Sequence, residues 1–113
     1  MSNAERAVIG DWRITHMSHW DTDYVDMDAP AYLRIWENVM GDFQFGLVHG
    51  ELMARIRSVD DVVRVDFEWE GADENDPASG HGWLKIRGDQ AEGRFCFNDG
   101  DDSDFAAVHA RGR

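Results

Sequence analysis

The sequence predicts an all-β fold, mainly an antiparallel up-and-down barrel of about eight strands. Apolar and polar residues alternate along several short segments, as they do in strands that bury one face. These segments are rich in Val, Phe and Trp, and short turns containing Gly, Asp or Asn separate them. The length of 113 residues fits one domain, which we assign to residues 10–111 after an N-terminal tail at 1–9.

The first predicted strand covers residues 11–20. Period-two alternation places one set of side chains on a single face: Trp12, Ile14, His16, Ser18 and Trp20. The following stretch, 21–28, is polar with a few apolar anchors, and we expect a loop there.

Residues 29–40 are compatible with a strand or a short helix. Asp28, Pro30 and Gly41 would delimit a helix. The run 32–36 is aromatic and aliphatic, however, and its neighbours in sequence are strand-like segments that need partners. We therefore predict a strand, with a helix covering one end of the barrel as the alternative.

Between residues 42 and 61 we expect, in order, a strand at 42–48, a turn at 49–51, a strand at 52–57 and a turn at 58–61. Phe43, Phe45 and Leu47 fall on one face of the first strand. Gly46 inside it indicates a bulge or a close approach by another backbone.

The segment 62–70 has the clearest strand pattern, because its apolar and charged residues alternate strictly. The remaining elements are a loop at 71–79, a strand at 80–87, a turn at 88–90, a strand at 92–98, an acidic turn at 99–103 and a last strand at 104–110. The inward face is predicted to contain Phe43, Phe45, Val65, Phe67, Trp69, Phe95 and Phe97.

The formal net charge of −12 disfavours several classes of partner. Nucleic acids and anionic membranes attract clustered Lys and Arg, so we expect neither as a partner. Most acids lie in the stretches 21–28, 60–76 and 99–104, where solvated turns explain them; a docking face for a basic partner or a metal site is the alternative. The acidic run from Asp99 lacks the glycine and glutamate of a calcium loop.

No metal site or cofactor is predicted from the histidines and the cysteine. His16 and His19 would point to opposite faces of a strand, which disfavours zinc. Cys96 is the only cysteine, so no intrachain disulfide can form. No signal-peptide pattern or long apolar run is present, and a bacterial cytoplasmic location is expected.

Gly10-Asp11-Trp12 at the start of the first strand resembles the Gly-x-Trp motif of lipocalin and avidin-type barrels. The resemblance implies that Trp12 packs across one end of the barrel. A looser similarity to small uncharacterised bacterial proteins covers residues 10–110 and implies a fold but no activity. The segments that carry it are 43–46, 67–71, 73–74 and 80–83.

Three classes of function follow from these patterns. The first is an interaction or structural module that contacts a protein through its acidic loops or a sheet edge, and an open edge strand would also favour a homodimer. The second is a barrel that binds a small apolar or aromatic molecule, with the candidate ligand-binding residues Tyr32, Arg34, Trp36, Arg55, His81 and Trp83. The third is an enzyme that uses a carboxylate or a histidine; Asp66 and Glu68 share a strand face, but no catalytic residue is assigned.

Overall fold

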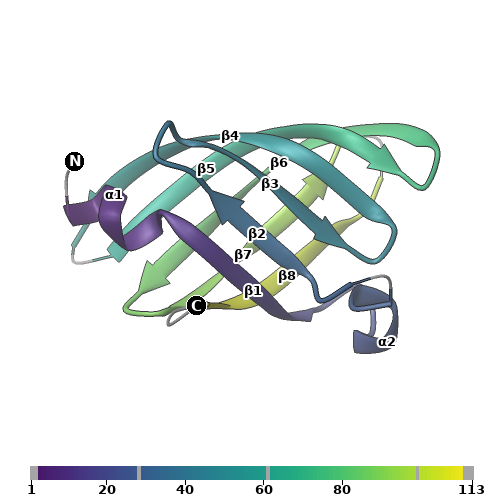
Figure 1. Ribbon diagram of the computed structural model, residues 1–113, viewed down its shortest axis with the longest axis horizontal. Coiled ribbons are helices and arrows are strands. Elements are labelled where there is room, and N and C mark those ends of the chain that lie inside the picture. The colour runs from purple at the N-terminus through teal and green to yellow at the C-terminus, as the bar shows by residue number, and fades with distance from the viewer. Residues whose placement is uncertain (1–2, 28, 61, 99, 111–113) are drawn as a thin grey trace.

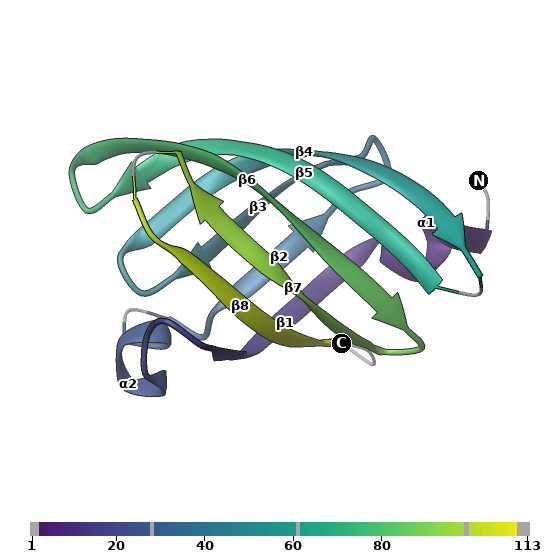
Figure 2. The same ribbon diagram turned by 180° about the vertical axis from the view of Figure 1, so that it is seen from behind.

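The computed structural model describes residues 3–27, 29–60, 62–98 and 100–110. They form a closed barrel in which each strand pairs with the next and β8 pairs with β1 (Figures 1 and 2). All pairings are antiparallel, so the predicted up-and-down barrel is confirmed. The strands are β1 Gly10–Met17, β2 Tyr32–Ile35, β3 Met40–Phe45, β4 Val48–Val59, β5 Val62–Asp73, β6 Asp76–Arg87, β7 Gln90–Phe97 and β8 Asp102–His109.

Two short helices flank the barrel at opposite ends (Figure 1): α1 Asn3–Val8 and α2 Thr22–Val25. The tail predicted at 1–9 therefore includes a helix, and the loop predicted at 21–28 includes another. Asp21 caps α2, because its side chain accepts a hydrogen bond from the Tyr24 N–H at 3.0 Å. Among the described residues, no helix is long and apolar enough to cross a membrane.

The ambiguous segment at 29–40 contains a strand. β2 pairs with β1 and β3 in register, and Leu33 and Ile35 are buried in the core. The alternative of a helix at 29–40 is wrong, because a helix would remove the pairing partner that each neighbouring strand uses here. A tight turn at 36–39 connects β2 to β3, where Val39 has a φ of 58°.

β1 is shorter than predicted, and its inward face changes along its length. Trp12 and Ile14 are buried as expected. The pairing with β8 then shifts between Ile14 and His16, which indicates a β-bulge. As a result Met17, instead of His16, enters the core.

The central strands are longer than predicted. β4, β5 and β6 have twelve residues each, so the turn expected at 49–51 is wrong and the loop expected at 71–79 is reduced to a turn at 74–75. Gly50 and Gly71, which suggested turns, are paired with each other inside the sheet. A Cβ on Gly50 would lie 3.0 Å from the ring of Phe43. Glycine is therefore favoured here because the Glu70 carbonyl oxygen, at 2.8 Å, and the Phe43 ring leave no space for a side chain.

Aromatic side chains fill the barrel interior. Phe95 is fully buried, and its ring centroid lies 4.8–5.4 Å from those of Phe43, Phe45, Phe67 and Phe105. The predicted inward residues all belong to the core or, for Phe97, pack against it. The interior is thus a packed core of side chains.

Trp12 closes the barrel on the side of α1. Its side chain is fully buried, and its indole N–H donates a hydrogen bond to the Val8 carbonyl at 2.8 Å. The ring of His109 packs edge-on against it at 4.8 Å. On the side of α2, Trp20 packs against Tyr24, Phe45 and Phe97.

Candidate functional site

The outer face of β3–β6 contains three adjoining depressions. The largest, of about 950 Å³, is bordered by Tyr32 and His49, among other residues. It shares Glu51, Glu70 and Ser79 with a second depression of about 370 Å³. The second in turn shares Met53 and Glu68 with a third of about 350 Å³. The three therefore form one continuous uneven surface, which we call the β3–β6 face.

A row of three carboxylates crosses this face. Asp42 on β3 is directly opposite Glu51 on β4, and Glu51 is directly opposite Glu70 on β5. Like charges in such cross-strand pairs destabilise a sheet. Arg34 neutralises Asp42, but within the described part of the chain Glu51 and Glu70 have no hydrogen bond or ion pair from their side chains. We call Asp42, Glu51 and Glu70 the acidic row.

A row of three bases crosses the same face nearer the β4–β5 turn. Arg57 on β4 is opposite Arg64 on β5, and Arg64 is opposite Lys85 on β6. The carboxylate of Asp66 lies 3.6 Å from Arg57 and 3.1 Å from Arg64, so two of the three cations share one acid. Arg64 and Lys85 also lie over the ring of Trp83, 4.9 and 5.6 Å from its centroid. Arg57, Arg64 and Lys85 form the basic row.

Tyr32 and Arg34, two of the six predicted ligand-binding residues, lie together on β2. The guanidinium of Arg34 stacks on the Tyr32 ring at 4.6 Å and donates two hydrogen bonds to Asp42, at 2.8 and 2.6 Å. This bidentate bond to a carboxylate raises the pKa of Arg34 further above its usual value.

The other four predicted residues are spread over the outside of the barrel. Arg55 and His81 border the third depression, and Trp83 lies beside them on β6. Trp36 lies in the β2–β3 turn and is 45% exposed. Since all six side chains lie outside the barrel core, a ligand that they contacted would bind to the outer surface. Their contact with a ligand stays a prediction.

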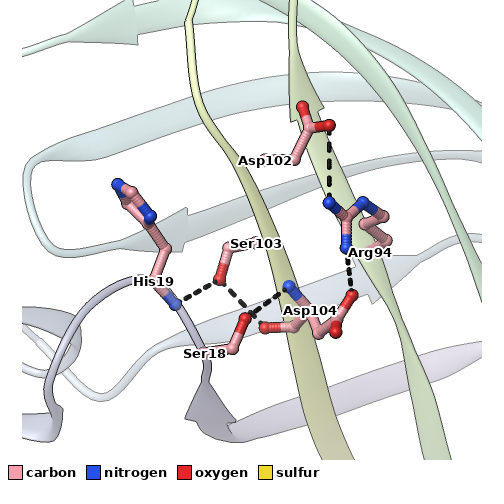
Figure 3. Close-up of polar contacts among 6 residues, drawn as sticks. All are labelled: Ser18, His19, Arg94, Asp102, Ser103 and Asp104. Carbon is pink, nitrogen blue, oxygen red and sulfur yellow. Dashed lines mark hydrogen bonds and ion pairs between the residues drawn. The ribbon is translucent and has the colours of Figure 1, made fainter.

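A second polar cluster fastens the end of β1 to β8 (Figure 3). The hydroxyl of Ser103, only 1% exposed, accepts a hydrogen bond from the His19 backbone N–H and donates one to the Asp104 carbonyl, both at 3.0 Å. The Ser18 hydroxyl accepts from the Asp104 N–H at 3.0 Å. Arg94 on β7 pairs with Asp104 and, at 3.5 Å, with Asp102.

This cluster contains Ser, His and Asp but does not have the geometry of a catalytic triad. A nucleophilic serine needs a histidine ring nitrogen within hydrogen-bond reach. Here the ring of His19 points away from Ser103 (Figure 3), and its Nε2 lies 3.2 Å from Asp101. The contacts of Ser103 instead satisfy backbone groups, which is a structural role.

Other candidates for chemistry lie on the surface or are buried. Asp66 and Glu68 share the outer face of β5 as predicted, but each lies beside arginines: Arg57 and Arg64 contact Asp66, and Arg55 lies 4.0 Å from Glu68. Cys96 is buried, and burial raises the pKa of its thiol. Within the described ranges, no group of three or more His, Cys, Asp or Glu side chains is placed to hold a metal ion.

Comparisons with protein-family models, with curated proteins and with solved structures find no significant match. The fold and the surfaces described above are therefore the basis for a functional proposal.

Sequence reasoning missed the acidic and basic rows. The signal was present along the strands, since β5 carries Arg64 at one end and Glu70 at the other. The rows are visible only in the register of β3, β4, β5 and β6, because the alternation within one strand does not say which residues of the next strand lie opposite.

Proposed function

We propose that this protein is a non-catalytic interaction module whose contact surface is the β3–β6 face. The observation that carries this proposal is where the unpaired charged groups and the depressions lie. The interior is occupied by aromatic rings, whereas the unpaired carboxylates and the adjoining depressions are on the outside.

The composition of the face supports a protein as partner. Met53 on β4, at the centre of the face, is 60% exposed. The half-buried ring of Trp83 lies two strands away on β6, two residues after His81, which is in line with Met53 across the sheet. Met and aromatic residues are enriched at the centre of protein interfaces, with charged residues around them. Closure of the barrel pairs β1 with β8 and so removes the open edge that strand addition at that position would need.

We also propose that this barrel is related to the lipocalins. The position of Trp12 at the start of β1, buried at one end of the barrel, supports it. The packed interior differs from a barrel that holds a ligand at its centre.

Site-specific photo-crosslinking tests the proposal. A benzophenone amino acid replaces Met53 on the proposed face, or Val108, which is 39% exposed on β8, as the control position. After irradiation in cell extract, we expect a covalent adduct with protein at position 53 and none at position 108. Glu70→Arg on the same face should weaken the adduct, whereas Asp23→Arg on α2 should not.

Both an adduct between two copies of the chain and an adduct with another protein would support the proposal. Equal labelling at both positions, or labelling at position 53 that Glu70→Arg does not change, would contradict it.

A further inference from the structure

We propose that the partner of the β3–β6 face is a second copy of this chain, docked face to face with its strands running in the opposite direction. This inference rests on the proposed function, and it specifies the partner. It gives Glu51 and Glu70, whose carboxylates have no partner among the described residues of a single copy, basic neighbours in the second copy.

The positions of the two rows make the face complementary to itself. On β5 the acidic row is at Glu70 and the basic row at Arg64, which are about 20 Å apart along an extended strand. A two-fold axis that crosses the strands midway between them places the acidic row of one copy over the basic row of the other. Because the axis is two-fold, the contacts occur in two equivalent sets. Glu51 and Glu70 of each copy face Arg57 and Arg64 of its partner, as an isologous interface requires.

The opposite relative orientation is unfavourable. If the strands of the two copies ran in the same direction, acidic row would face acidic row and basic row would face basic row. The two rows therefore favour this orientation of the dimer. It also brings Asp66 of one copy opposite Glu68 of the other near the axis, where each acid lies beside an arginine of its own chain.

The centre of the face suits such contact. Met53 and Trp83 lie between the two rows, close to the proposed axis, where they would be buried first. Their burial would supply apolar contact inside a charged rim.

The balance of charge on the face favours contact between two acidic chains. The whole chain has a net charge of −12, which opposes association. On β4, β5 and β6, by contrast, the outer positions from one row to the other, rows included, have four bases and four acids: Arg55, Arg57, Arg64 and Lys85 against Glu51, Asp66, Glu68 and Glu70. Asp42 on β3 is neutralised by Arg34. Two copies can therefore approach through this face with little net repulsion.

The available area indicates a weak dimer. Strands of twelve residues span roughly 40 Å, and three neighbouring strands are roughly 14 Å wide. A flat face of this size would bury about 550 Å² per copy, or about 1,100 Å² in total, and the convex outer surface of a closed barrel buries less, so the interface lies below the usual range of specific complexes. Association should accordingly depend on concentration in the micromolar range.

Sedimentation equilibrium of the purified chain tests the inference between about 1 and 500 µM. We expect a reversible monomer–dimer equilibrium. Reversal of the acidic row, Glu51→Arg with Glu70→Arg, should raise the dimer Kd at least about tenfold. Reversal of the basic row, Arg57→Glu with Arg64→Glu, should do the same. The control, Asp23→Arg with Glu37→Arg, changes the net charge as much as the acidic-row variant but lies off the face, and it should not weaken the dimer.

Mixing the two reversed variants gives the sharpest result. On β4 and β5 the first variant has bases at both row positions and the second has acids at both, so each should dimerise weakly alone and the pair should form a tighter heterodimer. Circular dichroism of each variant alone verifies that it is folded, and heterodimer formation by the mixture shows independently that both are competent to bind.

Three results would overturn the inference: a wild-type chain that is monomeric at every concentration, a dimer that neither reversal weakens, or a mixture that does not associate. If the chain is monomeric but position 53 still crosslinks to a different protein, the dimer is wrong and the interaction module stands. If position 53 gives no adduct either, both are wrong.

Discussion

Phe95 lies at the centre of the aromatic core, in ring contact with Phe43, Phe45, Phe67 and Phe105. Four strands meet at this one side chain, since its partners come from β3, β5 and β8 while it belongs to β7. Single residues of this kind connect strands that are not neighbours in the sheet, which backbone pairing alone cannot do.

Replacement of Phe95 by Ala should therefore lower the free energy of unfolding by about 3–5 kcal/mol, because it removes apolar contacts and leaves a cavity. Urea denaturation measures the change. Trp36→Ala is the matched control; its aromatic side chain is exposed in the β2–β3 turn, and its loss should change stability by less than about 0.5 kcal/mol. Equal effects of the two substitutions would contradict the central role of Phe95.

Cys96 offers a second prediction for a single residue. Burial, with a smaller effect from Asp102, raises the pKa of its thiol. Since the thiolate is the reactive form, the native protein contains less of it at any pH near neutrality than a free thiol does. Alkylation by iodoacetamide, followed by mass spectrometry, should be slower for the native than for the urea-unfolded chain. As the pH is increased, the alkylation rate of the native chain should level off at a higher pH than that of the unfolded chain. A native rate equal to the unfolded rate at pH 7 would argue against this.

At the scale of the elements, the pairing of β5 with β6 depends on a glycine. Gly82 is opposite Phe67, and a Cβ at this position would lie 2.5 Å from both the Phe67 ring and the Arg94 carbonyl. The ring of Phe67 occupies the space of the missing side chain, as Phe43 does at Gly50. The long strands β4–β6 thus contain glycines where the aromatic core approaches the backbone.

Gly82→Ala should destabilise the protein by about 1–3 kcal/mol through overpacking. Thermal unfolding monitored by circular dichroism measures the effect. In the β6–β7 turn Gly88 has a φ of +63° with nothing near its Cβ position, so Gly88→Asn, which tolerates that backbone conformation, should change stability little. A larger loss at Gly88 than at Gly82 would mean that turn geometry limits stability more than packing does.

For the whole molecule, net charge sets the dependence of stability on salt. A charge of −12 on a chain with a radius of gyration of 13.1 Å produces self-repulsion in the folded state. The Debye length falls from roughly 30 Å to roughly 8 Å between 0.01 and 0.15 M salt, and so becomes shorter than the molecule.

The Tm, measured at a concentration low enough to keep the chain monomeric, should therefore rise over this range of sodium chloride. The variant with Asp23→Arg and Glu37→Arg is less negative and should show a smaller rise. A Tm that falls with salt would indicate that exposed ion pairs such as Arg55–Glu68 outweigh the repulsion.

How much was predictable from the sequence depended on whether a pattern was local. The alternation from Val63 to Trp69 is local and correctly gave both a strand and its buried face. The strand at 32–35 was also predicted, because aromatic and aliphatic residues favour strand and its neighbours needed a partner. The positions of Gly50 and Gly71 were misjudged, because glycine is typical of turns and the close packing that requires it here is visible only once the strands are paired.

The same distinction applies to the candidate site. Alternation of apolar and polar residues placed Tyr32, Arg34 and Trp83 outside the set of inward-facing residues, and all three are on the outside of the barrel. Their neighbours across the sheet, and the acidic and basic rows, could not be read from the sequence.

By itself, then, the sequence determined the fold class, most strands and the aromatic inward face, since a two-residue period needs no knowledge of partners. Only the tertiary structure decided the register of β8 on β1, the bulge that turns Met17 inward, and the alignment of Asp42 with Glu51 and Glu70. These features depend on strand register, which the alternation within a single strand does not set.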